Sequence, residues 1–253
     1  MDVLVTGTAS GIGRACAELF LERGHNVVGL DVAEASIEHE RYRHLIADVR
    51  DRADLPAGLE PEIIVNNAGV QDSPDDIAVN LRGTINVTET YAFTGDGLAA
   101  TPAPRVRAVV NVGSASGHTG SEFPEYAASK GGVIAYTRNV ANRLAPQATC
   151  NSVDPGGVLT ELNRCVMDDG AMWRRIMELT PLRRWASPGE IAEWIYFVAV
   201  TNRFMTGQNL LVDGGGPRRV RLAHRVTPGD GARLSPSSSA PPPSAESRVP
   251  SRP

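Results

Sequence analysis

The sequence predicts a single doubly wound α/β domain, in which helices cover both faces of a seven-stranded parallel sheet. Two observations predict this fold class. Short apolar runs alternate with helix-length segments along most of the chain, and the first run is followed at once by a glycine-rich turn that opens a helix. Strand–helix alternation places successive strands parallel, with the helices on the two faces. The 253 residues are enough for one such domain.

The elements follow one another in chain order. Gly24 follows the first helix, and Pro188 stands at the first position of the last one, where its missing N–H is harmless. The predicted strands are residues 3–5, 27–30, 44–47, 63–65, 108–112, 149–153 and 209–212, and the predicted helices are residues 13–23, 75–90, 125–144 and 188–200.

The composition changes at Pro217. The last 37 residues hold eight prolines and seven serines, and seven arginines against Asp230 and Glu246 give them a local charge of +5. Such a segment cannot bury enough apolar surface to offset its ordering entropy. We therefore expect a folded domain at 1–216 and a disordered Pro/Ser/Arg-rich tail at 217–253; an arm that binds an acidic partner is the alternative to a passenger tail.

Bulk composition excludes several function classes. The net charge of −4 gives no electrostatic footprint for nucleic acid or an anionic membrane. Cys16, Cys150 and Cys165 have neither paired nor metal-ligand spacing, which is typical of reduced thiols. No signal peptide or membrane-spanning apolar run is visible. We expect a cytoplasmic protein without a metal, a nucleic-acid partner or a membrane.

The turn after the first strand reads Thr-Gly-Thr-Ala-Ser-Gly-Ile-Gly over residues 6–13. Glycines there let the backbone approach a pyrophosphate, whose charge lies at the helix N-terminus. A simple tight connection is the alternative interpretation. The candidate cofactor-binding residues of this turn are Gly7, Ser10, Gly11, Ile12 and Gly13.

Asp31 ends the second predicted strand, 18 residues after Gly13. A carboxylate there accepts hydrogen bonds from the adenosine ribose and repels a 2′-phosphate. No basic residue at Ser10 or just after Asp31 could receive that phosphate. The sequence therefore predicts that NAD(H) is preferred over NADP(H), although a helix cap or loop acid is the alternative for Asp31.

The candidate catalytic residues are Ser114, Tyr126 and Lys130. Positions four apart share a helix face, so the ammonium of Lys130 lies beside the phenol of Tyr126 and should lower its pKa. Tyr126 can then exchange a proton with a carbonyl or alcohol oxygen, and Ser114 can hydrogen-bond that oxygen. Lys130 is the one lysine among 25 basic residues, in a chain that otherwise uses arginine. Chance survival of a single lysine is the alternative reading of that count.

These residues, in this order, resemble the classical short-chain dehydrogenase/reductase family, whose fold is Rossmann-type. The resemblance covers residues 3–216, and further matching positions are Asn66, Asn151 and Asp213-Gly214-Gly215. It implies a homodimer or homotetramer acting on a small-molecule ketone or alcohol, with Asn80 completing the catalytic set by holding a water that relays protons to Lys130. It also implies that Lys130 bonds the nicotinamide ribose. The cofactor-binding residues that it implies are Asp48 and Val49 beside the adenine, Asn67, Ala68 and Gly69 on the adenosine side, and Tyr126, Lys130, Pro155, Gly156, Val158 and Thr160 toward the nicotinamide.

The sequence also departs from this family. The stretches from Asp48 to Asn66 and from Asn66 to Asn80 are short, and residues 94–107 are rich in Gly, Thr and Pro. We therefore expect shortened outer helices, which puts the usual oligomer contacts and the position of Asn80 in doubt. Asp154, directly before Pro155, is commonly uncharged in relatives; it either faces the cofactor cleft or bonds locally.

The predicted function is NAD(H)-dependent interconversion of a secondary alcohol and a ketone. A non-catalytic NAD-sensing protein on the same fold is the alternative, and a lyase or epimerase is disfavoured by the chain length and the C-terminal Asp213-Gly214-Gly215. Residues 115–123 and the stretch Glu161–Arg184 should form the substrate pocket and its lid. Methionines and Trp173 in the lid favour a medium-sized ketone, and polycyclic, heterocyclic, sugar-like and natural-product substrates remain open.

Overall fold

The computed structural model describes residues 1–121 and 123–216, so the predicted tail, 217–253, lies outside the described residues. Within them, seven strands form one sheet in the order β3-β2-β1-β4-β7-β8-β9, and every neighbouring pair is parallel. The predicted fold class is confirmed. The strands are β1 (Asp2–Thr6), β2 (Asn26–Asp31), β3 (Tyr42–Ile46), β4 (Ile63–Asn66), β7 (Ala108–Val112), β8 (Thr149–Pro155) and β9 (Asn209–Val212).

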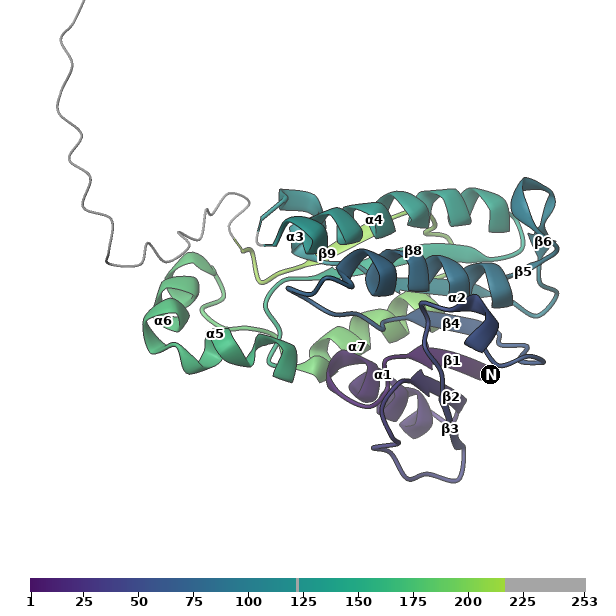
Figure 1. Ribbon diagram of the computed structural model, residues 1–253, viewed down its shortest axis with the longest axis horizontal. Helices are drawn as coiled ribbons and strands as arrows, with labels where there is room; N and C mark the ends of the chain where they lie inside the picture. The colour runs from purple at the N-terminus through teal and green to yellow at the C-terminus, as the bar shows by residue number, and fades with distance from the viewer. Residues whose placement is uncertain (122, 217–253) are drawn as a thin grey trace, which may run out of the picture. The chain divides into compact units, whose positions relative to one another are not determined.

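Two helical layers cover the sheet, as Figure 1 shows, with α1 and α7 on one face and α2 and α4 on the other. Side chains of a strand alternate between the faces, so Val3 and Val5 of β1 join the core under α1 and α7, while Leu4 joins the opposite core. The helices are α1 (Gly11–Glu22), α2 (Thr84–Tyr91), α3 (Ala115–Thr119), α4 (Pro124–Leu144), α5 (Arg164–Asp168), α6 (Gly170–Leu179) and α7 (Pro188–Tyr196).

Several elements differ from the sequence-based expectation. The predicted helix 75–90 begins as a π-helical turn, Ile77–Gly83, before α2, and the last helix ends in a second one, Phe197–Thr201. A short antiparallel hairpin of β5 (Phe93–Thr94) and β6 (Thr101–Pro102) occupies the glycine- and proline-rich region. Between β3 and β4 the chain forms only the single 3-10 turn Arg52–Asp54, in agreement with the expected shortening.

The strand order places a topological switch point between β1 and β4. From β1 the chain moves outward to β2 and β3, then returns to pair β4 on the other side of β1. Loops leaving β1 and β4 turn in opposite directions there, which opens a crevice at the carboxyl ends of the strands. In Figure 1 this is the side on which α5 and α6 lie, opposite the N-terminus.

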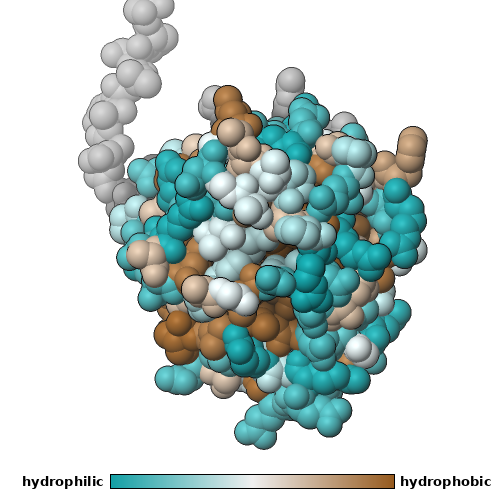
Figure 2. All heavy atoms as spheres, turned by 90° about the vertical axis from the view of Figure 1, so that its right-hand side faces the viewer, coloured by the Kyte–Doolittle hydropathy of each residue, from teal (hydrophilic) through white to brown (hydrophobic). Residues whose placement is uncertain are grey.

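The face around the N-terminal side of the sheet is mixed. Figure 2 shows mostly hydrophilic side chains on it, with one gathering of hydrophobic ones in its lower part. None of the helices in the described part of the chain combines the length and apolarity needed to cross a membrane.

Candidate active site

The glycine-rich turn folds tightly at the end of β1. Gly7 has a φ of +74°, and a β-carbon on Gly13 would lie 2.0 Å from the carbonyl oxygen of Gly7. Both positions therefore require glycine. The turn leads into the N-terminus of α1, where Ser10 is the N-cap residue without a side-chain cap and the first turn carries no acidic residue. The amide groups of this N-terminus are available to an anion such as a pyrophosphate.

Thr6 joins the turn to the loop that follows β4. Its hydroxyl accepts hydrogen bonds from the backbone amides of Asn67 (3.0 Å) and Ala68 (2.9 Å). The Asn67 side chain returns two bonds, to the carbonyl oxygens of Thr6 (3.0 Å) and Gly7 (3.2 Å). The candidate cofactor residues of the two loops, far apart in sequence, are thus held together across the switch point.

Asp31 lies at the end of β2 and faces the same turn. Its Oδ2 accepts a hydrogen bond from the amide of Ala9 (2.8 Å), and its Oδ1 accepts one from Ala33 (3.0 Å). Each carboxylate oxygen can accept a second bond, so the group can serve both the turn and a ribose.

Asp48 and Val49 occupy different surroundings. Val49 is buried against Gly83, where a β-carbon would come within 2.5 Å of it. Asp48 is paired with Arg50 (2.7 Å), which also reaches Asp75 (2.9 Å), and the Arg50 guanidinium lowers the pKa of Asp48. Sequence reasoning missed Arg50, because a charged residue on a short loop carries no spacing signal.

Tyr126 and Lys130 lie on one face of α4, as predicted. Nζ of Lys130 is 5.8 Å from the centroid of the Tyr126 ring and donates a 2.9 Å hydrogen bond to the carbonyl oxygen of Val112, the last residue of β7. Both side chains are buried, and Lys130 is only 5% exposed. The one lysine of the chain is therefore an interior cation.

Ser114 follows β7 directly and caps α3, because its Oγ accepts a hydrogen bond from the amide of Ser116 (3.1 Å). α3 packs closely on α4, since a β-carbon on Gly117 would lie 2.8 Å from the carbonyl carbon of Lys130. This contact places the strand-end serine and the Tyr126/Lys130 helix in one site.

Asn80 reaches the same site from the π-helical turn before α2. Its amide exchanges hydrogen bonds with the backbone of Val70 (2.8 and 2.9 Å) and donates one to Ser129 Oγ (3.0 Å). A β-carbon on Gly69 would lie 3.1 Å from Asn80 Oδ1 and 3.6 Å from Lys130 Nζ. Asn80 and Lys130 therefore flank Gly69, despite the shortened chain before them.

Burial dominates the electrostatics of this site. It lowers the pKa of Lys130 from its ordinary 10.5 to about 8, and the negative charges of Asp154 and Asp76 oppose that change. Burial also raises the pKa of Asp76 and of Asp154. The two carboxylates thus favour the charged form of Lys130 against the effect of its burial.

The remaining candidate residues begin with Pro155, the last residue of β8, and continue into the loop after it. Gly156 donates a hydrogen bond to Val212 of β9 (3.0 Å), and Val158 forms an isolated bridge with Ala186. The Thr160 side chain lies 3.4 Å from where a β-carbon on Gly11 would stand, so it lies close to the glycine-rich turn. The loop after β8 and the glycine-rich turn thus lie near one another at the carboxyl ends of the strands.

The predicted lid, Glu161–Arg184, forms α5 and α6. No residue of α6 is buried, and Figure 1 shows both helices projecting beyond the end of the sheet. Trp173 packs edge-on against Trp185, with ring centroids 4.9 Å apart, and this contact ties the lid to the loop before α7.

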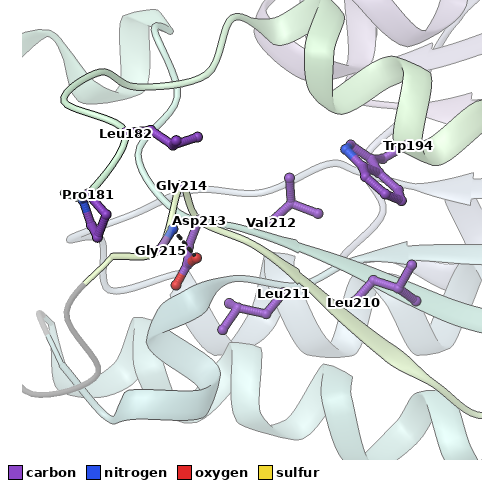
Figure 3. A pocket seen from close by; sticks show the side chains of 9 residues that line it. All are labelled: Pro181, Leu182, Trp194, Leu210, Leu211, Val212, Asp213, Gly214 and Gly215. Carbon is purple, nitrogen blue, oxygen red and sulfur yellow. Dashed lines mark hydrogen bonds between the residues drawn. The ribbon is translucent and has the colours of Figure 1, made fainter.

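A separate apolar groove lies between α7 and the edge strand β9 (Figure 3). It contains none of the candidate catalytic residues; its lining residues are Pro181, Leu182, Trp194, Leu210, Leu211, Val212, Asp213, Gly214 and Gly215. Within residues 1–121 and 123–216, no cluster of three or more His, Cys, Asp or Glu could hold a metal ion.

Asp154, for which the sequence left two alternatives open, pairs with a side chain of α3. Its carboxylate is fully buried, and its Oδ2 lies 2.5 Å from Nε2 of His118 on α3. Sequence reasoning missed His118, although a charged residue in a buried strand should itself have suggested a nearby partner.

The chain is similar to enzymes with known activities. The sequence pattern of the family described as Enoyl-(Acyl carrier protein) reductase matches residues 7–216. The 3-oxoacyl-[acyl-carrier-protein] reductase FabG of Vibrio harveyi is 33% identical over 238 residues, covering 84% of this chain and 95% of the relative.

Solved structures show the same likeness. A 4-hydroxyisoleucine dehydrogenase complexed with NADH is 26% identical, with a TM-score of 0.75, over 85% of this chain and 97% of that one. The aldohexose dehydrogenase of Thermoplasma acidophilum, in ligand-free form, is 28% identical, with a TM-score of 0.74, over 88% and 96% of the two chains.

Proposed function

The chain belongs to the classical short-chain dehydrogenase/reductase family and is an NAD(P)-dependent oxidoreductase, and on this basis we propose that it interconverts a secondary alcohol and a ketone, with Tyr126 as the acid/base. The observation that carries the proposal is the burial of the chain's one lysine beside Tyr126, with Nζ 5.8 Å from the ring centroid. An ordinary phenol titrates near 10, too high for a base at neutral pH, and the adjacent ammonium stabilises its ionised form.

The other side chains position the reacting oxygen and the proton. Ser114 stands at the carboxyl end of β7, where its hydroxyl can donate to the substrate oxygen while Oγ accepts from Ser116. Lys130 uses one of its three donors on Val112 and has others for ribose hydroxyls. Asn80, next to Gly69, supports a water on the proton path toward Lys130. A nicotinamide cofactor, when bound, supplies or accepts the hydride.

The crevice suits a dinucleotide. The turn at Gly7 and Gly13 packs too tightly for either residue to carry a β-carbon, and the uncapped N-terminus of α1 that follows it can hold a pyrophosphate. We propose NAD(H) rather than NADP(H), because the Asp31 carboxylate faces the turn and would meet a 2′-phosphate. The residues proposed to bind the cofactor lie on α4 and around the carboxyl ends of the strands. They are Gly7, Ser10, Gly11, Ile12, Gly13, Asp31, Asp48, Val49, Asn67, Ala68, Gly69, Tyr126, Lys130, Pro155, Gly156, Val158 and Thr160, with Asp48 and Val49 beside the adenine.

The proposed substrate is a medium-sized, partly apolar ketone or alcohol of polycyclic, heterocyclic or natural-product type. The lid supports this proposal, because the weakly docked helix α6 carries Met172 and Trp173, which can adapt to a bulky ligand. By their names, the relatives act on 3-oxoacyl-[acyl-carrier-protein], an aldohexose and 4-hydroxyisoleucine. Each of these classes therefore belongs in a substrate panel.

The decisive test follows NADH absorbance with that panel and a polycyclic ketone, comparing the wild type with Tyr126→Phe. We expect turnover of at least one ketone by the wild type and none by the variant. NADH binding without turnover of any ketone in either protein would favour the alternative, a non-catalytic NAD-sensing protein.

We propose that two copies of the chain associate through β9. This strand forms one edge of the sheet in the described part of the chain, and the apolar groove beside it includes Trp194, which is 45% exposed. Unpaired strand edges readily pair with a second copy.

The three cysteines are all free, which supports a reducing compartment such as the cytoplasm.

A further inference from the structure

Asp154 is an unusual group for the interior of a strand. It lies on β8 between β7 and β9, and its side chain is fully buried, whereas its partner His118 is 30% exposed. Burying a carboxylate costs free energy unless a partner stabilises its charge. The 2.5 Å contact with His118 Nε2 supplies one such partner from α3.

The carboxylate also borders the proposed catalytic set. A β-carbon on Gly113 would lie 2.0 Å from Asp154 Oδ1, so only glycine leaves room for the carboxylate there. The residue before Gly113 is Val112, whose carbonyl oxygen accepts the hydrogen bond of Lys130, and the residue after it is Ser114. Asp154 and Lys130 therefore meet the same short stretch of backbone at the end of β7.

Lys130 needs a negative charge nearby to remain an ammonium in this setting. The titratable groups that face it are Tyr126 on its own helix, Asp76 from the loop before the π-helical turn, and Asp154 from β8. Of the two carboxylates that favour its charged form, Asp154 has the larger effect. His118 contacts Asp154 from the α3 side of this group.

We propose that Asp154, oriented by His118, is a positioning residue that holds Lys130 in its protonated form beside Tyr126. This role rests on the proposed function, in which the ammonium of Lys130 stabilises the phenolate. A neutral His118 donates to Asp154 and leaves its negative charge intact.

The test exploits the fact that the sequence contains one lysine. Full-length protein labelled with 13C at Cε of lysine gives one lysine resonance, whose shift against pH reports the pKa of Lys130 directly. In Asp154→Asn we expect this pKa to fall by about one unit or more, because an isosteric neutral amide replaces the nearby charge. In the matched control His118→Gln, which keeps a hydrogen-bond donor to Asp154, we expect the pKa of Lys130 to stay within about 0.3 unit of the wild type.

An unchanged Lys130 pKa in Asp154→Asn would overturn the proposal and leave the pair as a structural tie between α3 and β8. If that variant does not fold, the comparison of the wild type with His118→Leu decides. There we expect the Lys130 resonance to titrate in a shoulder-free single step in the wild type, and its pKa to fall in His118→Leu, which removes the donor that orients Asp154. An unchanged pKa in His118→Leu would overturn the proposal. The lysine resonance can be measured without turnover. A chain that proved inactive as an oxidoreductase would therefore not by itself contradict the role proposed for Asp154.

Discussion

Replacing Lys130 by Met should change how stability depends on pH. The pKa of Lys130 is about 8 in the folded protein and ordinarily 10.5. Between these values the unfolded chain binds the proton and the folded chain does not, so the free energy of unfolding gains from this group as pH rises. The difference between these two pKa values corresponds to roughly 3 kcal/mol of unfolding free energy, at about 1.4 kcal/mol per pKa unit. The charged, buried lysine thus destabilises the fold below pH 8 and ceases to do so above the unfolded value.

Methionine has similar length and no charge, so Lys130→Met removes this contribution. At neutral pH we expect the variant to be about as stable as the wild type or up to about 2 kcal/mol more stable, because the gain is offset by about 1–3 kcal/mol for the Val112 carbonyl that loses its donor. Activity should fall by about 10²-fold or more, since the phenolate of Tyr126 loses its counter-charge.

The assay is urea unfolding followed by circular dichroism at several pH values from neutral to alkaline. The difference in unfolding free energy, wild type minus Lys130→Met, should rise by roughly 2–3 kcal/mol over this range. Arg138, exposed on the same helix, supplies the control: Arg138→Met should leave a flat difference curve. A flat curve for Lys130→Met as well would refute the interior ammonium and the pKa assigned to it.

Three other changes test the site and the interface. Tyr126→Phe should lower kcat/KM by about 10³-fold or more, about 4 kcal/mol of transition-state stabilisation, while NADH binding measured by fluorescence is retained; substantial residual turnover would remove Tyr126 as the acid/base. Wild-type kinetics should favour NADH over NADPH by roughly tenfold or more, and Asp31→Ala should narrow this ratio and raise KM for both cofactors, because the amide of Ala9 loses its acceptor; a wild-type preference for NADPH would contradict the argument. Leu211→Arg in β9 should convert dimers into monomers in light scattering with unchanged circular dichroism, whereas dimers that persist would place the interface elsewhere.

The regular part of the fold was predictable because its strands are nearly continuous apolar runs. Buried on both faces, residues such as Ile63, Ile64 and Val65 leave little doubt about β4. α3 and the β5–β6 hairpin were not predictable, because five- and two-residue elements are too short to show a period. The π-helical turn at Ile77–Gly83 depends on backbone pairing that apolar spacing does not encode.

The candidate site, too, was only partly predictable from the sequence. Lys130 and Tyr126 are four residues apart on one helix, so sequence spacing alone brings them together. The pairing of Asp154 with His118, 36 residues away, and of Thr6 with Asn67, 61 residues away, depends on which strands and helices become neighbours. Sequence could indicate that Asp154 was out of place, but not what it would meet.

Hydrogen bonds of Thr6 hold the two loops of the proposed cofactor site together, whereas the lid helix α6 has no buried residue. This difference affects how the free energy of ligand binding is used. The crevice is already assembled, so a dinucleotide need not organise it. α6 buries none of its own residues and is tied to the domain by the contact of Trp173 with Trp185, so contacts with a bound ketone can add to the packing of the lid. A bulky ketone that engages Met172 and Trp173 can spend that energy on enclosing the reacting carbon, whereas a fragment bearing the same carbonyl cannot. Shortening the substrate at the end remote from the carbonyl should therefore depress kcat as well as raise KM.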